Sequence, residues 1–340
     1  MLSAKNFYRW EKNMRSCVVG IGSVAPLHIN GLIECGQNIV ALCDVIPEKA
    51  EAAKEKFGLD CKIYTDYYKM VDELKPDVVH LSVPHYLHAD FSCYALNNGV
   101  NVVSEKPVAI TLEEIEKIKS AVKRSEAAFG VCQQNRYNSS VRYIKELFGD
   151  EPIESAAANL VWKRDADYYQ QSDWRGKWET EGGGLMINQA LHTLDLLQWF
   201  CGMPKSVTAS VSNLSLKGVI EVEDTATGVF QVDDNRRFVI TATNAAIDCY
   251  PITFHFRSQN HDVTMVGDNI IADGKFVVRS DGKPLYGKDV YGNGHAKLIA
   301  DFYDCLKTGR KFPIGIEEAQ NVVKLILAMY RSHGEKVDVE

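Results

Sequence analysis

Short apolar runs alternate with longer amphipathic stretches through the first 133 residues of the chain. Apolar runs of this length are typical of strands buried on both faces of a sheet, and the stretches between them have the length and periodicity of helices. The expected strands span residues 16–19, 38–43, 62–64, 77–83, 100–103 and 128–133, and the expected helices span residues 47–57, 67–74, 89–98 and a stretch beginning at Thr111. This alternation predicts an α/β fold with a doubly wound parallel sheet.

After residue 133 the pattern changes to strands joined by hairpin turns. One helix is expected at 139–147, and two helices, at 294–308 and 316–332, close the chain. Strand-like runs occupy residues 154–161, 206–214, 225–232, 237–243, 252–257 and 262–266. This part is expected to be α+β with a mainly antiparallel open sheet. We therefore predict an N-terminal extension at residues 1–15, a first domain at 16–135 and a second domain at 136–340.

Composition narrows the class of protein. The chain has 340 residues, 46% hydrophobic and 24% charged, which is ordinary for a soluble globular protein, and its net charge of −7 argues against a nucleic-acid partner. Its nine cysteines include no C-x-x-C pair, so we expect reduced thiols rather than disulfides or a zinc site. There is no apolar signal-peptide region near the N-terminus and no run long enough to span a bilayer, so we expect a cytoplasmic protein without a membrane partner.

A glycine motif follows the first expected strand. Residues 20–25 fit the pattern G-x-G-x-x-A. The first glycine allows a tight turn, the second lets the backbone approach a pyrophosphate, and the small third residue allows close packing of helix on strand. The motif predicts a Rossmann domain that binds a dinucleotide through Gly20, Gly22, Ser23 and Val24.

Asp44 ends the second expected strand at the position of a ribose-binding carboxylate. Its charge would repel the 2′-phosphate of NADP, and the residues that follow include no arginine, so the sequence favours NAD over NADP. Asp44 is also placed to cap the helix that begins at Pro47, and the two roles are compatible.

The segment Ser104-Glu105-Lys106-Pro107 follows another expected strand. A lysine at the carboxyl end of a parallel strand points to where open α/β sheets bind ligands. The residue before a proline is held extended, and X-Pro bonds are the main place where a cis peptide is tolerated. Taken alone, the segment could equally be a strand-to-helix turn with a surface lysine.

Three glycines at 182–184 precede an expected helix with polar side chains among leucines. Asn188 and His192 are four residues apart and should share one face of that helix. A single histidine on such a helix is more often a hydrogen-bonded core residue than a catalytic one. A lysine such as Lys106 in the same site reverses that preference.

Four ordered motifs together resemble the Gfo/Idh/MocA oxidoreductase family, named after glucose-fructose oxidoreductase and inositol 2-dehydrogenase. The similarity extends from Cys17 to Val337. The motifs are Gly20-x-Gly22-x-x-Ala25-x-x-His28, Val83-Pro84-x-x-Leu87-His88, Glu105-Lys106-Pro107 and the segment 182–195, which contains Asn188, His192 and Asp195.

The resemblance implies how a secondary alcohol is oxidised. His192 is the expected general base for the hydroxyl proton, and Lys106 would hydrogen-bond the hydroxyl and stabilise the developing alkoxide. Many members have Asp where this chain has Asn188, which cannot titrate but can orient the substrate or His192. No metal is expected, because Lys106 supplies the positive charge that a metal would provide.

The resemblance also implies further contacts. For the cofactor these are Val83, Pro84 and His88 along the adenosine-to-nicotinamide path, Glu105 at the nicotinamide ribose, and Trp174 with Arg175, although an aromatic loop packed on the domain interface would look the same. Separately, Arg136, just past the last strand of the first domain, could hold a carboxylate or polyol of the substrate, and Tyr291 is a weaker candidate of the same kind. A homodimer or homotetramer is expected, because the family often buries the outer face of its second-domain sheet between subunits.

The expected function is an NAD-dependent oxidoreductase that transfers a hydride between a secondary hydroxyl of a sugar, inositol or sugar-derived polyol and nicotinamide. One alternative is an enzyme without net redox, in which tightly bound NAD transiently oxidises a glycoside or anhydro-sugar to allow elimination, hydrolysis or isomerisation. Another is a nucleotide-binding sensor. Both enzyme hypotheses need the same lysine and histidine.

Overall fold

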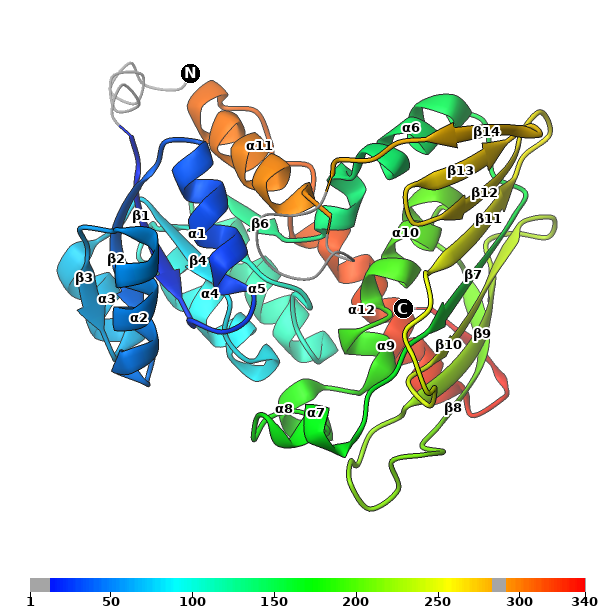
Figure 1. The fold of residues 1–340 in the computed structure, drawn as a ribbon, viewed down its shortest axis with the longest axis horizontal. Helices are drawn as coiled ribbons and strands as arrows, with labels where there is room; N and C mark the ends of the chain where they lie inside the picture. Colours follow the sequence, from blue (N-terminus) through cyan, green and yellow to red (C-terminus); the bar gives the residue numbers. More distant parts are fainter. Residues whose placement is uncertain (1–12, 283–291, 340) are drawn as a thin grey trace. The chain divides into compact units, whose positions relative to one another are not determined.

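The computed structural model describes residues 13–282 and 292–339, which form two compact units (Figure 1). The described part of the first unit consists of residues 13–108, 113–134 and 292–318, and that of the second consists of residues 109–112, 135–282 and 319–339.

The division corrects the expectation of one continuous second domain over 136–340. Helix α11 (Gly294–Thr308) belongs to the first unit, where it packs along helix α1 (Ala25–Glu34). Gly31 of α1 makes the close approach possible, since a Cβ added there would lie 2.7 Å from Cδ1 of Ile299. The first unit is therefore completed by a segment from much later in the chain.

The first unit contains the predicted doubly wound parallel sheet. Its strands are β1 (Arg15–Val19), β2 (Asn38–Cys43), β3 (Lys62–Tyr64), β4 (Val78–Leu81), β5 (Asn101–Ser104) and β6 (Phe129–Val131). They pair in the order β3-β2-β1-β4-β5-β6, all parallel. The connecting helices are α2 (Pro47–Phe57), α3 (Tyr67–Leu74), α4 (His88–Asn97), α5 (Leu112–Arg124) and the short η1 (His85–Leu87). All four residues of β4 are buried, as expected for a central strand covered on both faces.

The second unit is built on a mostly antiparallel sheet. Its strands are β7 (Ser155–Val161), β8 (Ser206–Ser212), β9 (Thr225–Gln231), β10 (Arg237–Thr243), β11 (Thr253–Arg257), β12 (Asp262–Val266), β13 (Asn269–Ala272), β14 (Lys275–Val278) and β15 (Lys336–Asp338). They pair in the order β14-β13-β12-β11-β7-β10-β9-β8-β15, with β7 and β10 parallel. Strands β13, β14 and β15 were not predicted, because each has only three or four residues and, unlike the equally short strands of the first sheet, none is marked by alternation with helices.

Helices cover one face of this second sheet. They are η2 (Gln134–Tyr137), α6 (Ser139–Phe148), α7 (Ala166–Gln170), α8 (Trp178–Glu181), α9 (Leu185–Asn188), α10 (Leu191–Cys201) and α12 (Ile316–Ser332). Helix α10 packs on β7 and β10, and α9 packs on β9 and β10. Gly228 of β9 leaves room for Met329 of α12, whose Cε would lie 3.1 Å from an added Cβ. In the part of the chain described here, no helix is long and apolar enough to cross a bilayer.

Candidate active site

Four predicted site segments follow the carboxyl ends of four adjacent strands of the parallel sheet. Strands β2, β1, β4 and β5 are neighbours in that order, and they lead into Asp44, the 20–25 loop, Val83 and Lys106 respectively. Because parallel strands end at the same edge of a sheet, these segments share one edge, which is where open α/β sheets bind ligands.

The two motif glycines differ in what surrounds them. Gly20 has φ +81°, its N–H donates to the carbonyl of Cys43 at 2.8 Å, and an added Cβ would lie 2.6 Å from the carbonyl oxygen of Ser82. Nothing lies within 4 Å of a Cβ added to Gly22. Gly20 is thus required by the turn, whereas Gly22 leaves open space of the kind that a pyrophosphate needs. The loop fits a dinucleotide.

The Asp44 carboxylate is fixed beside that loop. Its Oδ2 accepts the N–H of Ile21 at 2.7 Å, and its Oδ1 accepts the N–H of Ile46 at 2.9 Å. The first bond ties the end of β2 to the glycine loop, and the second caps the turn before α2. The structure therefore shows Asp44 holding the turn before α2 but not the predicted N-cap, because Ile46 occupies that position and no side chain caps the helix. The ribose contact stays a prediction.

The structure corrects the placement of His88. One ring nitrogen lies 2.6 Å from the carbonyl oxygen of Pro107, and the other lies 2.9 Å from that of Val83. The side chain has no exposed surface, and burial lowers the pKa of His88. A histidine held in this way links the loops after β4 and β5 and does not contact a cofactor, so we withdraw it as a cofactor ligand. Val83 and Pro84 are half-buried, and their assignment stays a prediction.

Glu105 is a buried carboxylate at the end of β5. Its Oε1 accepts from Nε2 of His28 at 3.0 Å and from Nε2 of His295 at 3.2 Å, and its Oε2 lies 3.3 Å from the N–H of Lys106. Burial by itself would raise the pKa of Glu105, but the two histidine hydrogen bonds outweigh it and hold that pKa well below its usual value. Lys106 is half-buried and precedes a cis peptide bond to Pro107. The predicted contact of Glu105 with a ribose remains a prediction.

A possible set of metal donors surrounds the same carboxylate. Ligand atoms of His28, Glu105 and Cys132 lie within 4.8 Å of one another, and all three residues are buried. The donor atoms of His28 and Glu105 are hydrogen-bonded to each other at 3.0 Å. Burial raises the pKa of the Cys132 thiol well above its usual value, which opposes the thiolate that a metal requires. We therefore interpret the group as a hydrogen-bond network.

In the second unit, the glycine run is fixed by its surroundings. A Cβ added to Gly182 would lie 2.4 Å from a side-chain atom of Ile110, and one added to Gly183 would lie 2.0 Å from the hydroxyl of Tyr330. Both glycines have positive φ, at +80° and +145°. The buried carboxylate of Glu223 accepts the N–H groups of Gly184 at 2.9 Å and Met186 at 2.8 Å, so it caps the start of α9.

The side chains of Asn188 and Glu181, on either side of the glycine run, are hydrogen-bonded to each other. The Nδ2 of Asn188 donates to Oε1 of Glu181 at 2.6 Å, and Oε2 of Glu181 accepts the N–H of Gly176 at 2.6 Å. Glu181 has no exposed surface, and burial raises its pKa to about 7. A group that titrates near neutral pH therefore lies against a predicted catalytic residue.

Asn188 and His192 do not lie on one helix, contrary to our prediction. Helix α9 ends at Asn188, and α10 begins at Leu191 with His192 as its second residue. The interruption occurs because the N–H groups of Gln189 and Ala190 both bond to the carbonyl of Leu185, at 2.9 and 2.8 Å. At this interruption, the Gln189 side chain donates to the hydroxyl of Tyr168 and accepts from the side-chain amide of Asn244. His192 is half-buried.

Arg136 is not placed to hold a substrate. Its Nε and Nη2 donate to the two carboxylate oxygens of Asp195 at 2.8 and 2.6 Å, and the side chains are only 3% and 1% exposed. A buried bidentate pair of this kind is a structural element, because separating it would leave a charge buried alone. We therefore withdraw the substrate role of Arg136. Tyr291 lies outside the described residues.

Arg175 is held in an aromatic loop of the second unit. Its guanidinium lies 4.9 Å from the ring centroid of Tyr168 and 5.1 Å from that of Trp174, and Nη1 donates to the hydroxyl of Ser172 at 3.1 Å. These contacts fix the loop by cation–π interactions. The cofactor role of Trp174 and Arg175 stays a prediction.

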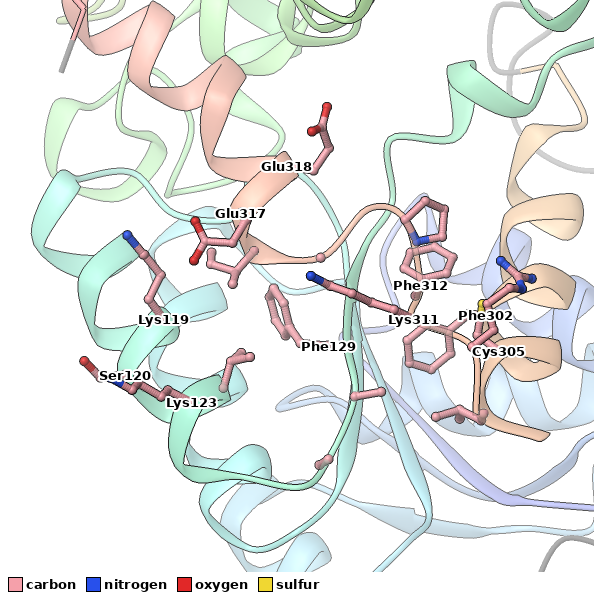
Figure 2. Close-up of a pocket in the computed structure, with 18 of the residues that line it drawn as sticks. Lys119, Ser120, Lys123, Phe129, Phe302, Cys305, Lys311, Phe312, Glu317 and Glu318 are labelled. Carbon is pink, nitrogen blue, oxygen red and sulfur yellow. The ribbon is translucent and has the colours of Figure 1, made fainter. Parts of the chain in front are cut away.

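A cavity of about 790 Å³ lies elsewhere in the first unit, against the edge strand β6 (Figure 2). Phe129, Phe302 and Phe312 form its apolar floor, and charged residues including Lys119 and Glu317 line its rim. None of the predicted cofactor or substrate residues within 13–282 and 292–339 lines it, so we do not assign it to the reaction.

Sequence reasoning missed four polar residues that the structure makes central. Glu181 had a weak signal, since it immediately precedes the glycine run, and His80 had one as a polar residue inside an apolar strand. Glu223 and Tyr303 had no signal, because each joins its partners only through the fold.

Comparisons with known proteins identify both domains of the chain. A profile of the oxidoreductase family with an NAD-binding Rossmann fold matches residues 14–133, and a profile of the GFO/IDH/MocA C-terminal domain matches residues 152–263. The WlbA dehydrogenase from Bordetella pertussis, solved in complex with NADH and UDP-GlcNAcA, superimposes with a TM-score of 0.85 and 25% identity over 97% of this chain and 99% of that one.

Two curated relatives match shorter parts of the chain. The inositol 2-dehydrogenase of Salmonella paratyphi B is 30% identical over 143 residues, which are 41% of this chain and 43% of that enzyme. The 2,7-anhydro-N-acetylneuraminate hydratase of Mediterraneibacter gnavus is 28% identical over 212 residues, 60% of this chain and 54% of that enzyme. The chain thus matches about half the length of each of these relatives. With both of its domains matched in order, the chain belongs to the Gfo/Idh/MocA family of oxidoreductases and carries that family's NAD-binding Rossmann domain.

Proposed function

We propose that this protein is an NAD-dependent dehydrogenase that transfers a hydride between a secondary hydroxyl of a sugar, inositol or sugar-derived polyol and nicotinamide. The observation that carries the proposal is the common edge of the parallel sheet. There the glycine loop, Asp44 and Lys106 follow β1, β2 and β5, three of the four central strands. The relatives named as inositol 2-dehydrogenase and as a dehydrogenase bound to NADH support the substrate class and the direction of the chemistry.

NAD, when bound, supplies the nicotinamide carbon that accepts the hydride. We propose that Gly20, Gly22, Ser23 and Val24 hold its pyrophosphate and that Asp44 accepts from the adenosine ribose hydroxyls. A 2′-phosphate at Asp44 would place two negative charges together, so NADP should bind less well.

The catalytic roles fall to Lys106, His192 and Asn188. We propose that His192 takes the hydroxyl proton as the C–H bond gives up its hydride, leaving a ketone, and that Lys106 donates to the same oxygen and stabilises its developing negative charge. We propose that Asn188, whose side-chain amide N–H donates to Glu181, orients the substrate or His192.

NADH formation tests the proposal directly. The purified protein would be incubated with NAD and a panel of sugars, inositols, uronates and anhydro-sugars while nicotinamide fluorescence is followed. Lys106→Ala and His192→Ala should each lower turnover by roughly 10² or more while NAD binding persists. Lys62→Ala and His333→Ala, which change the same residue types at exposed positions outside the proposed sites, serve as controls. Near wild-type turnover in either site variant would refute that assignment.

A second candidate is an enzyme that uses NAD without net redox, and the hydratase relative favours it. It would oxidise a ring hydroxyl transiently, acidify the neighbouring C–H and return the hydride after elimination or rearrangement. Consumption of an anhydro-sugar or glycoside without accumulation of NADH, together with slow exchange of NAD, would identify this chemistry. NAD binding without turnover of any compound would instead support the sensor hypothesis.

We also propose that the protein is a cytoplasmic homodimer or homotetramer. The pairing register of the second sheet supports assembly, because it aligns a row of residues across all nine strands on the face away from the helices. The row consists of Phe276, Ile271, Thr264, His255, Ala157, Val239, Val229, Thr208 and Lys336. Phe276 is 67% exposed and Ile271 is 50% exposed, as is typical of a surface that another subunit covers. Sedimentation should give a dimer or tetramer that Phe276→Glu weakens.

A further inference from the structure

A continuous chain of buried hydrogen bonds runs inward from Glu105. Nε2 of His28 lies 3.0 Å from Oε1 of Glu105, and Nδ1 of His28 lies 2.9 Å from Nδ1 of His80. Nε2 of His80 lies 3.0 Å from the hydroxyl of Tyr303, which lies 2.7 Å from Oγ of Ser16. Glu105 is 6% exposed and the other four residues are at most 1% exposed. We call these five residues the buried relay.

The relay joins five separate elements of the first unit. Ser16 lies on β1, His28 on α1, His80 on β4 and Tyr303 on α11, and Glu105 follows β5. These elements are spread along the chain from β1 to α11, so the alignment of the five side chains depends on the complete fold of the first unit. A central strand with an otherwise apolar core rarely contains a histidine unless its ring nitrogens have partners.

The proton positions along the relay follow from the ionised carboxylate at its end. A carboxylate only accepts, so His28 must donate through Nε2–H, and a neutral ring at this position then accepts at Nδ1. His80 must therefore donate through Nδ1–H and accept at Nε2 from the hydroxyl of Tyr303. Tyr303 in turn accepts from the hydroxyl of Ser16. With neutral imidazoles, this is the one arrangement that makes all four bonds.

The electrostatics favour this arrangement. Burial, followed by the neighbouring His28, lowers the pKa of His80 well below its usual value, so His80 stays neutral. The groups that face Glu105 are His28, His295, the thiol of Cys132 and the backbone of Lys106. Burial lowers the pKa of His295 and raises that of the Cys132 thiol, so both remain uncharged at neutral pH. The hydrogen bonds from His28 and His295 are the main influences that offset the burial of Glu105.

We propose that His80 and Tyr303 are positioning residues that hold His28 in its Nε2–H tautomer and so keep Glu105 an ionised acceptor immediately before Lys106. The functional consequence rests on the proposed role of Lys106. If Tyr303 no longer donates, His80 is free to move its proton to Nε2, and His28 then loses its donor at Nδ1. His28 can then carry its proton on Nδ1 and donate it to Nδ1 of His80, which leaves the Nε2 lone pair of His28 facing Glu105. Glu105 would then take up a proton or turn away from the backbone of Lys106.

Tyr303→Phe tests the proposal, because it removes one hydroxyl and nothing else. Tyr67→Phe is the matched control, since Tyr67 is also buried in this unit but donates to the carbonyl of Phe91, outside the relay. Ser16→Ala is a graded variant: it removes the last donor of the relay and leaves the bond from Tyr303 to His80 intact, so its effect should be smaller.

The first readout needs no substrate. In ¹⁵N-histidine NMR of the full-length protein, His80 should appear as a neutral Nδ1–H imidazole and His28 as a neutral Nε2–H imidazole, assigned with His80→Gln. Tyr303→Phe should change both patterns, and Tyr67→Phe should change neither. Unchanged histidine tautomers in Tyr303→Phe would overturn the proposal whether or not the dehydrogenase activity is established.

The second readout is kinetic. In Tyr303→Phe, kcat should fall roughly tenfold to a hundredfold, as is usual when a second layer of hydrogen bonds is lost, while the affinity for NAD changes little. The acid limb of the kcat profile should move to higher pH, because Glu105 without its donor is easier to protonate. A kcat and pH profile matching those of Tyr67→Phe would refute the positioning role. An inactive wild-type protein would instead count against the proposed function and leave the tautomer result intact.

Discussion

The side-chain amide of Asn188 donates to the carboxyl group of Glu181 across 2.6 Å, and Glu181 has no exposed surface. Many members of the family have an aspartate at the position of Asn188. Here a second carboxylate would face Glu181 at hydrogen-bond distance, and two carboxylates this close, one of them fully buried, cannot both ionise. The asparagine therefore fits the glutamate that precedes the glycine run.

Replacing Asn188 by Asp should expose this dependence. We expect Asn188→Asp to lower the free energy of unfolding by roughly 1–3 kcal/mol at pH 8, and by less at pH 5, where one of the two carboxyls is protonated. Urea unfolding can be followed by tryptophan fluorescence, because Trp162, Trp174, Trp178 and Trp199 all belong to the second unit. The double variant Asn188→Asp/Glu181→Gln restores one amide and one carboxyl, so it should recover most of the loss. No recovery would show that the pair is not coupled.

Glu181 itself should make the second unit less stable as pH rises. Folding raises its pKa to about 7 from an ordinary value near 4.5, so the folded state binds this proton more tightly than the unfolded chain does. The stability it contributes is complete below about pH 4.5 and is lost as pH rises through about 7. Relative to wild type, Glu181→Gln should therefore gain up to roughly 3 kcal/mol in unfolding free energy between pH 5 and pH 8.

The difference between the two proteins is the quantity to measure, because other groups titrate in the same interval. Burial lowers the pKa values of His80 and His295, which destabilises the fold toward acid pH and has the opposite sign. These histidines are the same in both proteins, so their effect cancels. A wild-type-minus-variant difference that is constant from pH 5 to pH 8 would contradict the assignment of a near-neutral pKa to Glu181.

The parallel sheet could be predicted because its signals are local. Val78, Val79 and Leu81 form a buried run that only a central strand explains, and Asp44 follows β2 at the distance that the glycine motif requires. Strands β13 to β15 could not be predicted, because three or four residues give too little alternation where no regular succession of helices marks the strands. The place of α11 in the first unit was also hidden, since only tertiary packing of Ile299 on Gly31 sets it.

The site was less predictable than the fold, because its polar contacts join distant parts of the chain. Arg136 looked like a substrate ligand, but its partner Asp195 is 59 residues away and nothing local marks the pair. His88 belongs to a recognisable motif, yet its role depends on two carbonyl groups that sequence does not place. A motif therefore indicated candidate residues and left open what each one contacts.

The two motif glycines should respond differently to the same substitution. Gly20→Ala forces a side chain into φ +81° and a Cβ to 2.6 Å from the carbonyl of Ser82, so unfolding free energy should fall by roughly 2 kcal/mol or more. Gly22→Ala adds its methyl group to open space, so stability should be nearly unchanged while NAD affinity falls. Denaturant unfolding and NADH fluorescence titration would be run on both variants. A stable Gly20→Ala, or a Gly22→Ala that binds NAD normally, would contradict the role given to that glycine.

Asp44→Asn should change which dinucleotide binds. The amide retains one acceptor for the N–H groups of Ile21 and Ile46 and loses the other, so a stability cost of about 1 kcal/mol is expected in the absence of cofactor. Removing the charge should weaken the binding of NAD by roughly tenfold, because a charge-assisted bond to the ribose is lost. It should also strengthen the binding of NADP relative to NAD, because the repulsion of a 2′-phosphate disappears.

Titration of NADH and NADPH gives the ratio of the two affinities. Asp60→Asn changes an exposed carboxylate before β3 and controls for the change in net charge. The ratio is the decisive quantity, since a loosened loop would weaken both dinucleotides equally. If Asp44→Asn lowers both affinities by the same factor, Asp44 only caps the turn before α2 and the cofactor preference is set elsewhere.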